Sequence, residues 1–122
     1  MSVRVLVVDD SPIFQAAVRA VIGSSQDLEQ VGEADCGEDA VALARSLVPD
    51  LVLVDVMLPG IDGIETCRQL EALDPAPFVV LCSTDDDPRQ SASVPSCPMA
   101  PFVTKVSLSA ATLLEAWRTR GA

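Results

Sequence analysis

Short apolar runs alternate with amphipathic segments along most of the chain. The apolar runs are Val3–Val8, residues 51–54, residues 78–82 and Phe102–Thr104, with a weaker one at Leu28–Ala34. Continuous short apolar runs are typical of strands that are buried on both faces, as in a parallel sheet. The pattern therefore predicts five strands.

Apolar residues recur at helical spacing between these runs. We expect helices at Pro12–Gly23, Gly37–Leu47, residues 63–73 and residues 107–118. The prolines at 88, 95, 98 and 101 leave room only for a short helix at 88–94. The apolar positions are Ile13, Ala16, Ala17, Ala20 and Val21 in the first helix, Ala40, Val41, Ala44 and Leu47 in the second, Ile64, Cys67, Leu70 and Leu73 in the third, and Ala110, Leu113, Leu114 and Trp117 in the last.

Strands that alternate with helices form right-handed βαβ units, which build a parallel sheet with helices on both faces. The expected fold class is therefore α/β, with a doubly wound, five-stranded sheet. A chain of 122 residues has room for one domain, which we expect to span residues 1–122. In open sheets of this kind, ligands bind at the carboxyl ends of the strands, near the point where strand order reverses.

Composition narrows the classes of function. The formal net charge of −10 argues against nucleic-acid binding, which needs clustered basic residues. No apolar run is long enough for a membrane span or a signal peptide, so we expect a soluble cytoplasmic protein. The four cysteines form no Cys-x-x-Cys pair and the chain has no histidine. We therefore expect free thiols, and neither a zinc site nor a nucleophile activated by histidine.

Acidic residues stand at two of the predicted strand ends. Asp9 and Asp10 end the first strand, and Asp55 ends the third. Taken singly, each has a local explanation, because acids cap helices and occupy turns. If the first and third strands are neighbours, however, the three carboxylates converge and repel one another unless a cation neutralises them. Mg²⁺ prefers such oxygen ligands, so this edge of the sheet is a candidate magnesium site.

Two further polar residues end strands on the same edge. Ser83 ends the fourth strand, and Lys105, the sole lysine of the chain, ends the fifth. The other seven basic residues are all arginine, which suggests that this position needs a compact ammonium group. A lysine in the cleft would balance part of the acidic charge and could hold a phosphoryl oxygen.

Four segments together resemble the response-regulator receiver domain of two-component signalling. They are VLVVDD at 5–10, DVMLPGIDG at 55–63, VVLCS at 79–83 and FVTK at 102–105. The resemblance spans almost the whole chain. It implies a flavodoxin-like fold with strand order 2-1-3-4-5. It also implies a phosphoacceptor domain that assists its own phosphorylation and dephosphorylation and is not otherwise an enzyme.

The resemblance assigns the acids and their neighbour. Asp55 would accept a phosphoryl group from a phosphohistidine on a sensor histidine kinase or a phosphotransfer protein. Asp10 would bind Mg²⁺ directly, and Asp9 would act through a water molecule. Asp55 and the backbone carbonyl of Met57 would complete the protein ligands. Transfer of this kind depends on positioning and charge neutralisation more than on covalent help from the protein.

The remaining implied roles concern the phosphoryl group and the response to it. Lys105 would pair with phosphoryl oxygens, and the Ser83 hydroxyl and the Thr84 backbone N–H would donate to them. Ser83 and Phe102 would be the switch residues, Phe102 turning inward after phosphorylation. The surface formed by the short helix, the fifth strand and the last helix, here called the output surface, would then repack. A homodimer would use the same surface.

The sequence departs from the family pattern only near that output surface. Val106 stands where many members have proline, and PMAP at 98–101 replaces a stretch that is usually rich in small residues. A receiver that is never phosphorylated and serves only as a protein-binding or dimerisation module is the main alternative. Its usual mark would be the loss of an acid or of the lysine, and none of these is missing here.

Two other classes match the motifs less well. Aspartyl-nucleophile phosphatases carry an Asp-x-Asp pattern after the first strand, whereas Asp9 and Asp10 are adjacent. Nucleotide-binding domains carry a glycine-rich loop after the first strand, and the chain has neither Gly-x-Gly-x-x-Gly nor Gly-x-x-x-x-Gly-Lys there.

Overall fold

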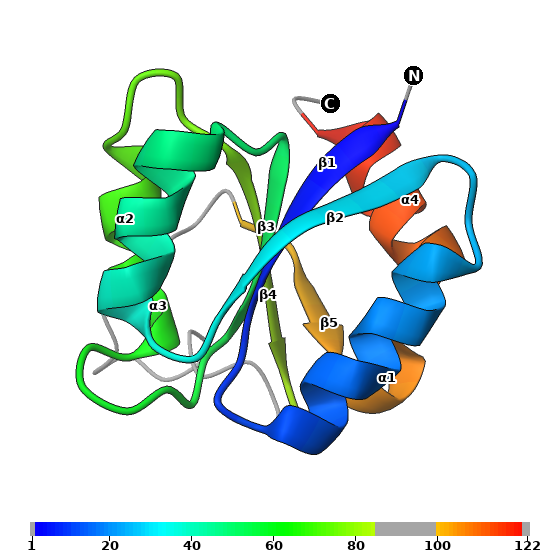
Figure 1. The fold of residues 1–122 in the computed structure, drawn as a ribbon, viewed down its shortest axis with the longest axis horizontal. Helices are drawn as coiled ribbons and strands as arrows, with labels where there is room; N and C mark the ends of the chain where they lie inside the picture. The colour runs from blue at the N-terminus through cyan, green and yellow to red at the C-terminus, as the bar shows by residue number, and fades with distance from the viewer. Residues whose placement is uncertain (1, 85–99, 121–122) are drawn as a thin grey trace.

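A computed structural model describes residues 2–84 and 100–120, and five strands form one sheet within them. The strands are β1 Val3–Val8, β2 Leu28–Ala34, β3 Leu51–Asp55, β4 Phe78–Ser83 and β5 Phe102–Thr104. They pair in parallel in the order β2-β1-β3-β4-β5. The expected sheet, its strand order and its fold class are therefore confirmed (Figure 1).

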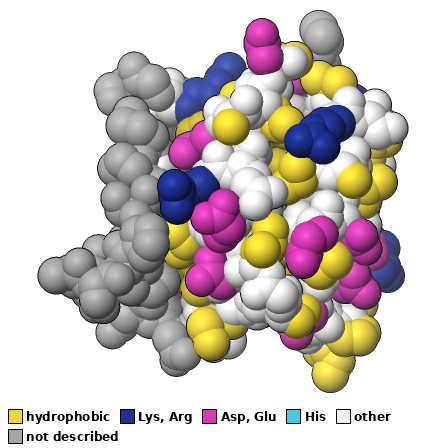
Figure 2. All heavy atoms as spheres, turned by 90° about the vertical axis from the view of Figure 1, so that its left-hand side faces the viewer, with side chains coloured by type: hydrophobic (Ala, Val, Ile, Leu, Met, Phe, Trp, Pro, Cys, Tyr) yellow, Lys and Arg dark blue, Asp and Glu magenta, His cyan; other side chains and the backbone are white. Residues whose placement is uncertain are grey.

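Helices cover both faces of the sheet (Figure 1). They are α1 Pro12–Gly23, α2 Gly37–Leu47, α3 Gly63–Glu71 and α4 Ala110–Thr119, with a short 3₁₀ turn, η2, at Lys105–Ser107. The helices α2 and α3 lie on one face, and α1 and α4 lie on the other. On the α2 and α3 side of the molecule, Figure 2 shows carboxylates interspersed with apolar side chains. The short helix expected at 88–94 lies outside the described residues.

The continuous apolar runs fill two cores. Successive strand side chains point to opposite faces, so a strand covered on both sides must be apolar at every position. Along β1, Leu6 and Val8 pack with α2 and α3, whereas Val5 and Val7 pack with α1 and α4. Both cores are made almost entirely of aliphatic side chains, with Trp117 at the edge of the second. The cysteines at 36, 67 and 82 are free thiols, as expected, and Cys97 lies outside the described residues.

The last helix begins later than predicted. Its first residue is Ala110, not Ser107, because Ser109 forms the N-cap. The Ser109 hydroxyl accepts a hydrogen bond from the Thr112 backbone N–H at 3.1 Å, and the Ser109 N–H donates to the Thr112 hydroxyl at 2.8 Å. This reciprocal capping box satisfies amide groups that have no partner inside the helix. The third helix likewise ends at Glu71, two residues before the predicted end.

The buried face of α1 differs from the predicted apolar positions. The residues buried in α1 are Gln15, Val18 and Ile22. Four of the residues predicted to be buried are exposed instead: Ile13, Ala16, Ala17 and Ala20. Three of these four are alanines, which contribute little apolar area, and the face that carries Val18 and Ile22 goes into the core instead. Alanines at helical spacing are weak indicators of a buried face, and the predicted apolar face of α1 was wrong.

Candidate functional site

Three carboxylates meet at the carboxyl end of the sheet. Asp9 follows β1 and Asp55 ends β3, and these two strands are neighbours. Oxygen atoms of Asp9, Asp10 and Asp55 all lie within 4.8 Å of one another. Asp9 and Asp55 are buried, with 1% and 4% of their surface exposed, whereas Asp10 is exposed. The parallel topology thus brings together the acids that the sequence singled out.

Lys105 reaches the same cluster from the end of β5. Its Nζ lies 2.7 Å from Asp9 Oδ2 and 3.2 Å from Asp55 Oδ2. The aromatic ring of Phe14 lies beneath the ammonium, with its centroid 4.2 Å from Nζ. Burial lowers the pKa of Lys105, but its hydrogen bonds to Asp9 and Asp55 and their negative charges outweigh that effect and leave the pKa raised. The lysine is therefore a fixed positive charge within the site.

Opposing interactions act on Asp55. Burial raises its pKa above that of an ordinary carboxyl group, and the negative charge of Asp9 adds to the rise. The Met57 N–H, which donates to Asp55 Oδ1 at 3.0 Å, and the Lys105 ammonium both act to lower it. The balance leaves the pKa raised, mainly because the carboxylate is buried and secondly because Asp9 is negatively charged. A further cation would relieve this imbalance.

The acids after β1 do not cap α1. Its N-cap is Ser11, whose hydroxyl accepts a hydrogen bond from the Phe14 N–H at 3.2 Å. Asp9 instead uses Oδ1 to accept from the Ser11 N–H at 2.8 Å, and it turns Oδ2 toward Lys105. The local explanation by capping therefore fails for both acids, since Asp10 is exposed and the cap is already supplied.

The start of α3 packs closely against the backbone of Asp55 and Val56. Gly63 begins α3, and its N–H donates to the Val56 carbonyl at 3.0 Å. A Cβ atom at Gly63 would lie 2.2 Å from the carbonyl oxygen of Asp55. Only glycine permits this approach of α3 to the loop. The side chain of Met57 points outward and is 67% exposed.

The other residues selected from the sequence lie around this cluster. Ser83 ends β4 and is 1% exposed, and Thr84 follows it at the surface. Ser83 pairs in register with Thr104, directly before Lys105. Phe102 opens β5 and is half-buried against the core beneath α2 and α3. The structure therefore places Ser83 next to the strand that carries Lys105, whereas β4 lies between the strand of Phe102 and that of Asp55.

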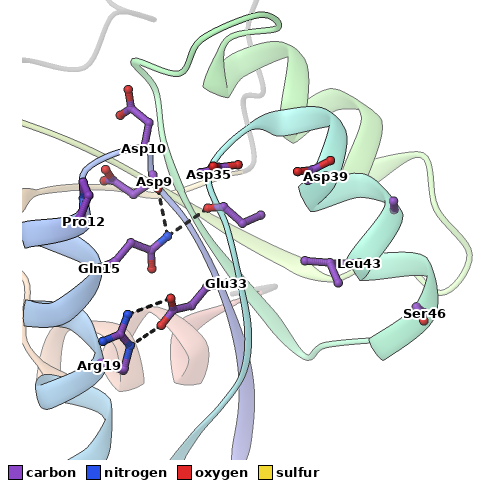
Figure 3. Close-up of a pocket in the computed structure, with 12 residues that line it drawn as sticks. Asp9, Asp10, Pro12, Gln15, Arg19, Glu33, Asp35, Asp39, Leu43 and Ser46 are labelled. Carbon is purple, nitrogen blue, oxygen red and sulfur yellow. Dashed lines mark hydrogen bonds and ion pairs between the residues drawn. The ribbon is translucent and has the colours of Figure 1, made fainter.

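Two residues of α1 that contact site residues were not predicted from the sequence. Phe14 supplies the ring beneath Lys105. Gln15 is 7% exposed, and its Nε2 donates to the carbonyl oxygens of Asp9 and Ala34, both at 3.0 Å (Figure 3). Gln15 thereby ties the ends of β1 and β2 together below the acids. Gln15 belongs to no recognisable sequence motif. It was also not on the face of α1 that was predicted to be buried.

Cys82 lies beside Asp55 in the sheet register and is fully buried. Burial raises the pKa of its thiol strongly, and the neighbouring charge of Asp55 raises it further. The thiol is therefore protonated near neutral pH and is no nucleophile. The chemistry of this site rests on carboxylates, hydroxyls, backbone groups and the lysine.

Comparison with known proteins identifies the family. The response regulator receiver domain model matches residues 5–118, and the chain belongs to this family. Response regulator GacA from Pseudomonas aeruginosa is 42% identical over 87 residues, which cover 70% of this chain and 41% of GacA. The chain thus spans less than half of the length of such curated relatives.

Solved receiver structures share the fold. The response regulator domain of Thermotoga maritima CheB is 29% identical with a TM-score of 0.77, and the match covers 98% of this chain and 96% of that one. The CheX–CheY–BeF₃–Mg²⁺ complex from Borrelia burgdorferi gives 25% identity and a TM-score of 0.74, over 95% and 87% of the two chains. Among the described residues, no helix has the length and apolar character needed to cross a membrane.

Proposed function

We propose that residues 1–122 form a phosphorylatable receiver domain in which Asp55 accepts a phosphoryl group from a phosphohistidine. The observation that supports this proposal is the surroundings of the Asp55 carboxylate. One oxygen accepts the Met57 N–H at 3.0 Å, the other faces Lys105 Nζ at 3.2 Å, and the oxygens of Asp9 and Asp10 lie within 4.8 Å. Such an arrangement holds a nucleophile and neutralises charge, which are the main requirements of phosphoryl transfer.

The residues present suit a hard divalent cation. The three carboxylates carry three negative charges and Lys105 balances one, so a dication would bring the cluster close to neutrality. Exposed Asp10 is free to bind Mg²⁺ directly. Asp9 already uses both oxygens, for the Ser11 N–H and for Lys105, which suits a ligand that acts through water. Asp55 and the Met57 carbonyl would complete the set. Bound Mg²⁺ would neutralise phosphoryl oxygens.

The transfer needs no other acid or base from the protein. An oxygen of Asp55 forms a bond to phosphorus while the bond from phosphorus to the donor imidazole nitrogen breaks, and that nitrogen keeps the electron pair and later takes a proton. Lys105 stays charged and pairs with the phosphoryl oxygens. The Ser83 hydroxyl and the Thr84 N–H donate hydrogen bonds to them. The chain thus assists its own phosphorylation and, with water as nucleophile, its own dephosphorylation.

Phosphorylation would be reported by the output surface. The phosphoryl group adds a charge of about −1.5 to −2 beside Ser83. Ser83 moves toward it, and the half-buried ring of Phe102 turns inward behind it. The strand β5 and the helix α4 then repack, and a homodimer would use this surface. The rest of the output surface lies outside the described residues.

The partner that donates the phosphoryl group would be a sensor histidine kinase or a phosphotransfer protein. Three large apolar side chains next to site residues in the chain are exposed: Ile13 is 85% exposed, Met57 67% and Val106 92%. Large apolar side chains that stay exposed close to a functional site are candidates for a protein interface. We propose that they contact the phosphodonor protein, and that the valine at 106 retains the apolar character of the more usual proline.

Incubation with acetyl phosphate and Mg²⁺ tests the proposal. Intact-mass spectrometry should show one phosphoryl adduct on the wild type and on Asp27→Asn, which removes an exposed acid elsewhere. Asp55→Asn should show none. A folded wild-type protein that never gains the adduct would instead favour the alternative of a receiver that acts only as a binding module.

A further inference from the structure

A cavity of about 810 Å³ lies between α1 and α2, beside the candidate phosphorylation site (Figure 3). Its walls come from the ends of β1 and β2 and from the facing sides of the two helices. Pockets that hold small organic ligands have volumes of this order. The lining includes Asp9 and Asp10 but not Asp55, and it continues to Leu43 and Ser46 of α2.

The wall of the cavity holds an unpaired buried acceptor. Gln15 is 7% exposed and donates both of its described hydrogen bonds through Nε2. Its Oε1 is buried and has no hydrogen-bond partner among the described residues. In Figure 3 this oxygen faces the space above the ion pair of Arg19 and Glu33, which also line the cavity. A buried amide oxygen without a donor is unfavourable, so an occupant that donates a hydrogen bond to it would stabilise this wall.

Charge adds a second requirement. Five carboxylates line the cavity, at Asp9, Asp10, Glu33, Asp35 and Asp39. The single basic side chain in the lining is Arg19, and it is already paired with Glu33 through two of its nitrogens. Asp9 is paired with Lys105, so Asp10, Asp35 and Asp39 are the carboxylates of the lining for which the described residues supply no basic partner. Their charges favour an occupant that carries positive charge.

The third requirement is an aliphatic surface. Leu43, Ala42, Ala34 and Pro12 form the apolar part of the lining. A bare metal ion would satisfy the acids but would leave this surface and the Gln15 oxygen without a partner. An anion would be repelled by the carboxylates. A small molecule with an alkyl chain and a cationic, hydrogen-bond-donating end meets all three requirements.

We propose that this cavity binds a free aliphatic organic cation, an alkylamine or alkylguanidinium. Its N–H groups donate to Gln15 Oε1 and to the surrounding carboxylates, and its alkyl chain lies against Leu43. Because Asp9 and Asp10 line both this cavity and the acid cluster around Asp55, the organic cation and Mg²⁺ weaken each other's binding. Only this antagonism rests on the proposed phosphorylation site. The cation site itself does not.

Nuclear magnetic resonance of the metal-free protein with agmatine, an alkylguanidinium that carries an amine, tests the site. Saturable shifts should appear in the side-chain amide of Gln15 and in the backbone amides of Ala42 and Leu43. Tetramethylammonium has the same charge sign but no N–H donor, so it should bind at least about tenfold more weakly. Equal shifts from both cations, or an unmoved Gln15 amide, would show only diffuse attraction to an acidic surface and would overturn the proposal.

Variants locate the binding. Asp39→Asn should lower the affinity for agmatine by about threefold, because it removes one exposed carboxylate from the lining of the cavity. Asp27→Asn removes the same charge outside the lining and should leave the affinity unchanged. Ala42→Arg, at an exposed helical position that accepts arginine well, should fill the cavity with the chain's own guanidinium and abolish binding. Equal weakening by Asp39→Asn and Asp27→Asn would contradict a defined site.

A Mg²⁺ titration separates the two proposals. Mg²⁺ should lower the affinity for agmatine in the wild type, and by less in Asp55→Asn, which removes a proposed Mg²⁺ ligand outside the cavity. If the affinity for agmatine does not change with Mg²⁺ concentration, the antagonism is refuted and the cation site remains supported. If the wild-type protein binds no agmatine but is phosphorylated normally on Asp55, the cation site alone is refuted.

Discussion

The helices on the two faces of the sheet support the site by different means. On the α3 side the contact is made by backbone, with Gly63 packed against the Asp55 carbonyl and no side chain between them. On the α1 side two side chains make the contact, Gln15 through hydrogen bonds and Phe14 through its ring. A backbone contact fails abruptly when atoms are added, whereas a side-chain contact can be weakened in steps. Substitutions on each side should separate these two modes.

The largest effect is expected on the α3 side. Gly63→Ala would place a Cβ 2.2 Å from the Asp55 carbonyl oxygen and 2.4 Å from Val56 Cα, so the backbone must shift. We expect a loss of about 3 kcal/mol in the free energy of unfolding, measured by urea titration. Gly23→Ala is the matched control, because a Cβ there meets nothing within 4 Å. Similar stabilities for the two variants would show that α3 can move away from the loop.

On the α1 side, Gln15→Met should have a smaller but more specific effect. It removes the donor to the carbonyls of Asp9 and Ala34 while keeping a side chain of similar length. The expected loss of stability is about 2 kcal/mol. Because Gln15 fixes the turn that carries the acids, Mg²⁺ affinity should fall by about tenfold. Gln69→Met, at an exposed position of α3, is the control for both measurements. A stability loss with unchanged Mg²⁺ affinity would limit Gln15 to a packing role.

Substitution of Asp55, which lies between α1 and α3, should raise the free energy of unfolding instead of lowering it. Asp55→Asn removes a buried charge while Lys105 keeps its partner Asp9, so the metal-free protein should gain about 1 kcal/mol of stability near neutral pH. The raised pKa of Asp55 means that the folded state binds its proton more tightly than the unfolded state does. Its unfavourable contribution therefore appears as the pH rises through the raised pKa, and it is absent below the ordinary carboxyl pKa.

Unfolding of Asp55→Asn and wild type across this pH range measures the effect. The two curves should converge in acid and separate as the pH rises, and saturating Mg²⁺ should close the gap by stabilising the wild type. Asp27→Asn, at an exposed site, should show no such divergence. A variant that is less stable than the wild type at neutral pH without metal would mean that the ion pair with Lys105 outweighs burial.

The same contrast explains what the sequence could predict. Apolar runs and strand-end acids are local patterns, and parallel topology turns them into a shared edge, so the sheet and the meeting of Asp9, Asp55 and Lys105 followed from the sequence. The buried face of α1 did not follow, because four apolar positions at helical spacing turned out to be exposed. Gln15 was missed for the same reason, since a polar residue looks like a solvent position until the carbonyls that it bridges are known.

The smallest effect should come from Phe14→Leu, which keeps an apolar side chain but removes the ring 4.2 Å from Lys105 Nζ. A cation over an aromatic face gains about 0.5–1 kcal/mol, so the pKa of Lys105 should fall toward its ordinary value. Because Lys105 is the sole lysine, selective lysine labelling gives one signal for an NMR titration. Phe78→Leu, whose ring instead packs edge-on against Trp117, should leave that titration unchanged. If Phe14→Leu also left it unchanged, the carboxylates alone would fix the lysine, and α1 would support the site through Gln15 only.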